Sequence, residues 1–180
     1  MTLKELTKAK HEVAEQLPFI KKLFNKTVTP EEYLKYLYQM YPVYKILEHK
    51  ANHLKILNGI SGLERADRIQ EDITELHTII PSNTILPKNF SILNETQLYT
   101  SYLIQLQDPK KVLAHLYVRH MGDLYGGQML KLCVPGSAKW YWFDNAPELI
   151  SKLRGLFTVE LAAEANIAFD YSIKIIEQLS

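Results

Sequence analysis

The chain has 180 residues, of which 47% are hydrophobic and 23% charged, so it can bury the core of one globular domain. Lys and Arg number 21 and Asp and Glu 20, and this balance argues against a nucleic-acid-binding domain, which usually carries a marked basic excess. The single cysteine, Cys133, excludes a disulfide framework and CxxC motifs. We expect one soluble, cytoplasmic domain over residues 1–180, because the charged start lacks a signal-peptide core and no apolar run approaches the roughly 18 residues of a membrane span.

Capping signals and prolines predict helices along the whole chain. Residues 2–17 have helical periodicity, and Pro18 ends the pattern. Thr29 and Glu32 form a capping box around Pro30, which opens a helix to about residue 57 with an expected kink at Pro42. Further helices are predicted over residues 63–80, 94–107 with a second capping box at 94–97, 108–133, a short one opened by 145–148, and 158–179, with a loop at 81–87. No alternating strand pattern of any length occurs, so the prediction is an all-α bundle of about seven to eight helices.

The first predicted helix has two different sides. At about 100° per residue, one side presents, within roughly 60° of arc, Lys4, Lys8, His11 and Glu15. The opposite side carries Leu6, Ala9, Val13 and Leu17, which we expect to face the core. The polar side is either a solvated face or a ligand slot. In a ligand slot, a neutral imidazole coordinates a metal and the ammonium groups pair with carboxylates of the ligand.

Three of the seven glycines fall within residues 122–127, inside a pattern that is otherwise helical. Each interior glycine costs about 1 kcal/mol relative to alanine, so some other interaction must offset this loss. Gly122 and Gly126 are four residues apart and clear one face of side chains, with Arg119 on that face and Asp123 at its edge. Such a face admits either a second helix or a flat ligand close to the backbone.

Several catalytic motifs are absent from the sequence. It contains no P-loop, no GxGxxG fingerprint, no GxSxG elbow and no Glu-x-x-His pair of the di-iron type. His49 and His53 are four residues apart, but no HExxH pattern surrounds them, so we interpret them as part of a polar helix face.

The segment HLYVRHMGDLYGGQMLK, residues 115–131, resembles the signature of the haem oxygenase family, whose core reads roughly R-x-x-GD-x-SGGQ. Three further segments are similar to helices of that family in the same order: KAKHEVAEQLPFIKKLF, VTPEEYLKYLYQMYPVYKILE and AAEANIAFDYSIKIIEQL. The resemblance therefore touches most of the chain, and it implies the helical bundle of that family.

The resemblance also implies a site for haem b, which is both substrate and cofactor in this family. His11 would be the proximal iron ligand, Gly122 and Gly126 would lie over the haem, and Asp123 would organise water and deliver a proton. The other implied residues are Arg119 and Tyr44 in the polar network, Lys4 and Tyr117 near one propionate, Glu15 beside the proximal histidine, Phe169 in the wall, and Lys152 and Arg154 as candidates for the second propionate.

The implied activity is the O₂-dependent cleavage of haem to biliverdin, CO and Fe²⁺. A ferredoxin or a flavoprotein reductase would supply electrons, since the sequence shows no flavin or nicotinamide motif; neither a nucleic acid nor a membrane is an expected partner. Three features differ from the family pattern: Tyr125 stands where a serine is usual, the segment between Lys152 and Glu164 is short, and Ser172 replaces a common asparagine. Two other classes stay open, namely a non-catalytic haem carrier or sensor, which needs no Asp123, and a helical interaction module without haem.

Overall fold

The computed structural model describes residues 1–84 and 91–179, and every regular element within these ranges is helical. The α-helices are, in chain order, α1 (Leu3–Gln16), α2 (Pro18–Phe24), α3 (Pro30–His53), α4 (Ala66–Ile79), α5 (Asn94–Gln105), α6 (Pro109–Leu116), α7 (Gly122–Tyr125), α8 (Gly127–Leu130), α9 (Ala146–Arg154) and α10 (Ala162–Glu177). The π-helical segment is η1 (Tyr117–Met121), and the 3-10 helices are η2 (Lys139–Tyr141) and η3 (Val159–Leu161). The all-α prediction is confirmed, whereas the single domain over 1–180 stays a prediction.

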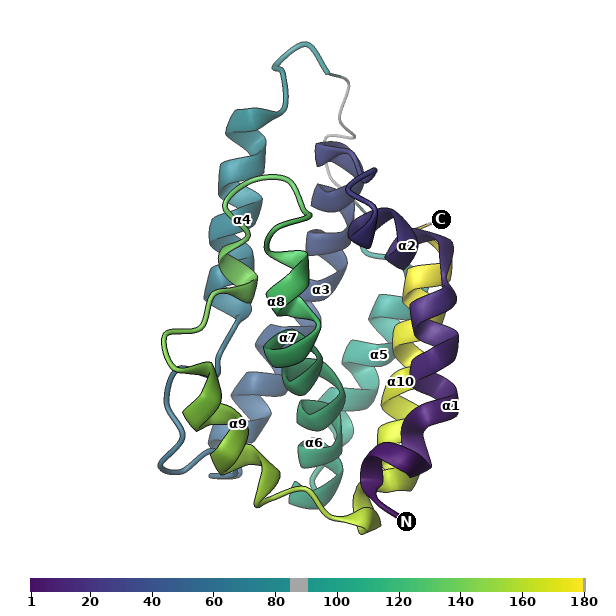
Figure 1. Cartoon of the computed structure of the whole chain (residues 1–180), viewed down its shortest axis with the longest axis vertical. Coiled ribbons are helices and arrows are strands. Elements are labelled where there is room, and N and C mark those ends of the chain that lie inside the picture. The colour runs from purple at the N-terminus through teal and green to yellow at the C-terminus, as the bar shows by residue number, and fades with distance from the viewer. Residues whose placement is uncertain (85–90, 180) are drawn as a thin grey trace.

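The helices form a bundle in which α3 lies between α4 and α5, and α1 lies along α10 at one edge (Figure 1). Residues 109–130, which comprise α6, η1, α7 and α8, follow one another as a single rod that packs against α3 and α10 (Figure 1). In the same view this rod, α1 and α10 all run upward from the end of the molecule where the N-terminus lies (Figure 1).

The predicted capping box at the start of α3 is confirmed. The Glu32 backbone N–H donates to Thr29 Oγ1 at 3.2 Å, and the Thr29 N–H donates to Glu32 Oε2 at 3.0 Å. The helix continues through Pro42 and ends at His53, four residues before the expected end. A similar box that the sequence analysis did not identify, between Thr2 and Glu5, opens α1.

The second predicted capping box is wrong. Asn94 is already the first helical residue of α5, and the residue before it, Leu93, has no side chain that can cap. Instead, the Leu93 N–H donates at 2.9 Å to Oε1 of Gln39, which lies on α3, so a neighbouring helix fixes this start. The loop predicted at 81–87 lies partly outside the described residues.

The helix predicted over 108–133 is one rod with an interruption. Asp108 caps its start by accepting from the Lys110 N–H at 2.9 Å, but the helix widens to a π-helical turn at residues 117–121 and ends at Leu130. Because the residues after a π-turn are rotated about the axis, side chains beyond it point in other directions than the sequence spacing predicts.

The predicted core face of α1 is partly wrong. Leu17 is buried as expected, but Ala9 and Val13 are exposed, and the buried side chains within the helix are Leu3 and Thr7. The reason is that α1 packs along α10, and polar contacts between the two helices decide which side of α1 faces inward. These contacts are Asn166 Nδ2 to Leu6 O at 3.3 Å and Lys10 Nζ to Asp170 Oδ1 at 2.5 Å.

Candidate functional site

A buried carboxylate lies where three parts of the fold meet. Asp123 on α7 is 7% exposed, and its Oδ2 accepts two hydrogen bonds. The Tyr44 hydroxyl on α3 donates at 2.7 Å, and the Trp140 indole N–H on η2 donates at 3.1 Å. Within the described residues no side chain or backbone group hydrogen-bonds Oδ1. One carboxylate oxygen is therefore fixed by the protein, and the other is free to bind something else.

The surroundings of Asp123 bring the pKa of its carboxyl group toward neutral pH. Burial raises the pKa of Asp123 to about 6, against the opposing effects of the nearby His120, the hydrogen bonds from Tyr44 and Trp140, and Arg119. A carboxyl group with a pKa in this range can both release and accept a proton near pH 7, which is the requirement for general acid–base chemistry.

A guanidinium and an imidazole on η1, those of Arg119 and His120, lie near this carboxylate. Arg119 is buried, its guanidinium reaches Met40 Sδ at 3.5 Å, and its Nε has no hydrogen-bond partner within the described part of the chain. His120 is also buried: its Nε2 lies 2.9 Å from Glu48 Oε1, while its Nδ1 has no such partner. A buried polar atom without a partner costs about 1–3 kcal/mol, so such atoms mark sites where function competes with stability.

The three clustered glycines have two different reasons to be glycine. A Cβ atom on Gly127 would lie 2.6 Å from Cδ1 of the buried Tyr141, so close packing explains this residue. A Cβ on Gly122 would meet nothing within 4 Å, and one on Gly126 would meet only the Gly122 carbonyl at 3.3 Å. Close helix packing therefore explains Gly127 but not the bare face at Gly122 and Gly126, which stays open for a ligand.

We expect alanine at these glycines to have opposite effects on the protein without ligand. Gly127→Ala should lower the free energy of unfolding by about 1–3 kcal/mol, because Tyr141 must move. Gly122→Ala should raise it by up to about 1 kcal/mol, since alanine favours the helix and nothing obstructs its methyl group. Urea denaturation of both variants measures the difference. A loss of stability in Gly122→Ala comparable to that of Gly127→Ala would contradict the open face.

His11 on α1 is exposed, as the sequence pattern predicted for the polar side of this helix. Its ring meets the ring of Phe169 on α10 edge to face, with 6.0 Å between the centroids. Glu15 Oε1 lies 3.6 Å from His11 Nδ1, one turn further along, and Lys4 is exposed two turns before His11. The imidazole is thus accessible, with an aromatic wall on one side and charged groups around it.

A contact between α1 and the 109–130 rod relates His11 to the glycines. Thr7 Oγ1 and Tyr117 Oη are 3.4 Å apart, and both helices continue from this contact in the same direction (Figure 1). At 1.5 Å per residue of α-helix, His11 lies about 6 Å beyond Thr7, and Gly122 comes five residues beyond Tyr117, across the wider π-helical turn η1. The imidazole and the bare backbone are therefore at similar heights on neighbouring elements.

The two basic residues of α9, Lys152 and Arg154, contact different parts of the fold. Lys152 Nζ lies 2.7 Å from Glu148 Oε1 and 3.4 Å from Gly59 O, so it faces the loop after α3 and is not brought together with the other candidates. Arg154 donates a hydrogen bond to the Tyr125 hydroxyl, and Tyr125 is 47% exposed. The tyrosine that replaces the usual serine thus points outward and connects α7 to α9.

Trp140 is the site residue that the sequence analysis did not identify. The segment KWYWF, residues 139–143, holds both tryptophans of the chain. A tryptophan that is 1% exposed needs a partner for its indole N–H, and this requirement is the signal that a polar group lies next to it. The sequence does not say which polar group this is, because the contact between Trp140 and Asp123 on α7 forms only in the tertiary structure.

Comparison with known proteins gives one consistent result. A family model described as "Heme oxygenase" matches residues 1–144 of the chain. The "Heme oxygenase" of Guillardia theta is 28% identical to it, covering 98% of this chain and 84% of the relative. The protein of the same description from Porphyra purpurea is also 28% identical, with coverage of 99% and 85%.

Solved structures are also similar. Heme oxygenase-1 from the cyanobacterium Synechocystis, crystallised in complex with heme, has a TM-score of 0.80 at 24% identity, with coverage of 99% of this chain and 90% of that one. Heme oxygenase from Leptospira interrogans has a TM-score of 0.81 at 24% identity, with coverage of 99% and 100%. At this level of identity these two likenesses establish the fold.

In the described part of the chain, no helix is both long enough and apolar enough to span a membrane.

Proposed function

The chain belongs to the haem oxygenase family, and on this basis we propose that it uses O₂ and external electrons to cleave haem to biliverdin, CO and Fe²⁺. The observation that carries the proposal is the arrangement at Asp123. A buried carboxylate with one free oxygen stands beside the bare backbone of Gly122, and an accessible imidazole, His11, lies at a similar height on a neighbouring helix.

The residues fit haem by their chemistry. A neutral imidazole is the usual proximal ligand of haem iron, and a helix face without Cβ atoms lets a flat ring approach the backbone. The unpartnered Nε of Arg119 and Nδ1 of His120 are polar atoms available to a network of water beside Asp123. When bound, haem supplies the iron that binds O₂ and the ring that is opened.

The chain's own residues would then have separate tasks. His11 would hold the iron through its imidazole, with Glu15 near Nδ1 and Phe169 as the wall. Gly122 and Gly126 would let the flat ring approach the backbone, because their helix face carries no side chain. Asp123 delivers a proton through water from its free oxygen, and Tyr44 keeps its other oxygen in place.

The carboxylate groups of haem need cationic or hydroxyl partners at the edge of the site. We assign one of them to Lys4 and Tyr117, because Tyr117 contacts Thr7, which is one turn from Lys4 on α1. Arg154 is the candidate for the other, because it already donates to Tyr125 on α7. Lys152 is ion-paired with Glu148 instead. Electrons would come from a ferredoxin or a flavoprotein reductase, which basic side chains at this edge can attract by complementary charge. The cytoplasmic setting stays a prediction.

A spectroscopic assay tests the proposal directly. Haemin is added to the purified protein, and ascorbate or a ferredoxin system is then supplied in air. We expect a Soret band on addition of haemin, followed by its loss and by growth of a red-absorbing bilin. A Soret band that persists under reductant would show a carrier instead, and the absence of any Soret change would show that the chain does not bind haem. A carrier has no evident use for a buried acid at the bare helix face, so Asp123 favours catalysis.

A further inference from the structure

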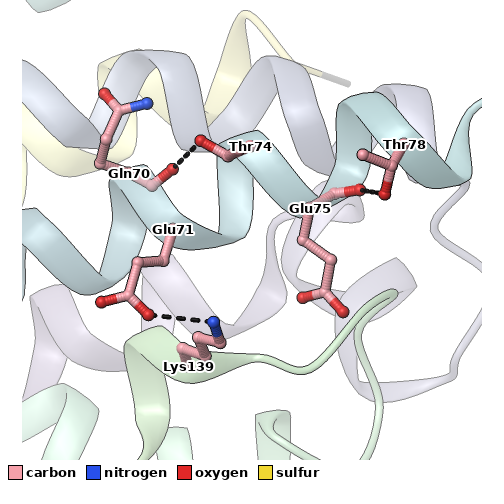
Figure 2. Close-up of a pocket in the computed structure, with 6 residues that line it drawn as sticks. All are labelled: Gln70, Glu71, Thr74, Glu75, Thr78 and Lys139. Carbon is pink, nitrogen blue, oxygen red and sulfur yellow. Dashed lines mark hydrogen bonds and ion pairs between the residues drawn. The ribbon is translucent and has the colours of Figure 1, made fainter.

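The turn before η2 is anchored on α4 by a row of acidic side chains, Glu71, Asp72 and Glu75, which we name the α4 acidic row. Glu75 accepts from the backbone N–H and the hydroxyl of Ser137, at 2.9 and 2.6 Å. Asp72 accepts from the backbone N–H of Lys139 at 2.8 Å and from that of Trp140 at 2.9 Å. Figure 2 shows the outer side of this anchor, where Lys139 reaches Glu71, with 3.0 Å between Nζ and Oε2.

The backbone of this turn adopts a conformation that ordinary residues avoid. Gly136 and Ala138 have φ angles of 80° and 52°, in the left-handed region that is costly for any residue with a Cβ, such as Ala138. A Cβ on Gly136 would also lie 3.3 Å from Glu75 Oε2. Such a turn persists only when its surroundings determine it, and the α4 acidic row supplies four hydrogen bonds and one ion pair that do so.

The result of this anchoring is a fixed position for the Trp140 indole. Its ring stacks on Tyr141 with 4.7 Å between the centroids, and it also packs against Tyr44 at 5.3 Å and Tyr36 at 5.6 Å. The guanidinium of Arg65 donates to the Trp140 carbonyl at 3.3 Å. The indole N–H therefore has one available direction, and it ends on Asp123 Oδ2.

We propose that Trp140 is a positioning residue for haem cleavage: its indole N–H, placed by the α4 acidic row, shares Oδ2 of Asp123 with Tyr44 and so leaves Oδ1 without a protein donor and free for proton transfer. Two donors on one oxygen prevent rotation of the carboxylate, because any turn of the group would break both hydrogen bonds. They also stabilise the ionised form, against the effect of burial. The consequence for turnover rests on the proposed function, whereas the effect on the carboxylate does not.

Substitution of Trp140 by phenylalanine tests this role. It removes the donor and keeps a ring for the stacking. The group that titrates in this test is Asp123. The substitution leaves the other titratable or charged side chains around it in place. These are Tyr33, Tyr36 and Tyr44 on α3, Arg65 at the start of α4, Arg119 and His120 on η1, and Tyr141 on η2. We expect Asp123 to become an acid about tenfold weaker, which is a rise of about one pH unit in its pKa.

The measurement uses the protein without haem. The carboxyl carbon of Asp123 is followed by NMR from pH 4 to 9 in protein labelled with ¹³C-aspartate, and Asp123→Asn assigns the signal. The matched control is Trp142→Phe in the same turn: Trp142 is 56% exposed, its N–H donates to Ser137 O at 3.0 Å, and it does not touch Asp123. An Asp123 titration that is equal in Trp140→Phe, Trp142→Phe and the unmodified protein would overturn the proposal.

A second variant separates the lost hydrogen bond from damage to the fold. Benzothienylalanine at position 140 keeps the bicyclic shape and replaces the N–H by sulfur. We expect the same shift of the titration as with phenylalanine, together with a tenfold or greater loss in kcat for biliverdin formation and little change in KM. Retention of full turnover in this variant would overturn the positioning role. The two readouts separate the proposals. If neither the unmodified protein nor any variant forms biliverdin, the proposed function fails. If the Asp123 titration still shifts as expected, the effect of the Trp140 N–H on the Asp123 carboxylate stands.

Discussion

Replacement of Asp123 by alanine is expected to leave haem binding intact and to lower the rate of biliverdin formation at least about 100-fold. The side chain is buried and does not coordinate iron in the proposed arrangement, so its loss removes proton delivery and little binding energy. General acid catalysis contributes about 10²–10⁴-fold in enzymes, which sets the size of the expected loss.

The measurement combines a haem titration followed at the Soret band with single-turnover formation of biliverdin. Asp170→Ala is a suitable control, since this aspartate lies on another helix, α10, in an ion pair with Lys10. Full turnover by Asp123→Ala would remove the carboxylate from the reaction, and a large loss of haem affinity would show that it has a structural role in the site instead.

Asp123→Asn is expected to make the protein without haem more stable at neutral pH. The pKa of Asp123 is about 6 in the folded chain and about 3.9 in an unfolded one. The folded state therefore holds this proton more tightly, and stability falls as the pH rises from the unfolded pKa through the folded one. The full difference is on the order of 3 kcal/mol at pH 7.5 and about 1 kcal/mol at pH 4.5.

Asparagine keeps an oxygen that accepts from Tyr44 and Trp140 and carries no charge, so it should recover most of this difference. Urea unfolding at pH 7.5 and 4.5 measures it. A gain of equal size at both pH values would indicate a cause other than the buried charge.

Replacement of His11 by alanine is expected to lower haem affinity by at least about 100-fold, since loss of groups that only orient a ligand already costs 10–100-fold at metal sites. Turnover should be lost with it. Because His11 is exposed, the fold without haem should change in stability by less than about 0.5 kcal/mol.

Optical titration with haemin gives the affinity, and added imidazole should restore part of the Soret spectrum by occupying the vacated space. His53→Ala is the matched control, because it replaces another exposed histidine at the end of a helix. An unchanged haem spectrum in His11→Ala would remove this residue from the site, and a changed spectrum in His53→Ala would show that the assay does not isolate one ligand.

The local elements of the fold could be predicted from the sequence, because their causes are local. The Thr29–Glu32 capping box, the proline after α1 and the Asp108 cap all depend on contacts within four residues. The start of α5 could not be predicted in the same way, since Gln39 on another helix holds it. The core face of α1 was misjudged for a related reason: its orientation depends on α10, about 160 residues away.

The features of the candidate site also fall into two groups, those that local sequence predicts and those that depend on tertiary contacts. The sequence by itself determined that a histidine lies in a polar stripe and that glycines and an aspartate share one turn of helix, because periodicity and composition record these facts. Only the tertiary structure decided which glycine is open, which oxygen of Asp123 is free and that Trp140 holds the other one. These facts depend on atoms of α3, α7 and η2 that meet in space, and the spacing of residues along one chain carries no measure of such a distance.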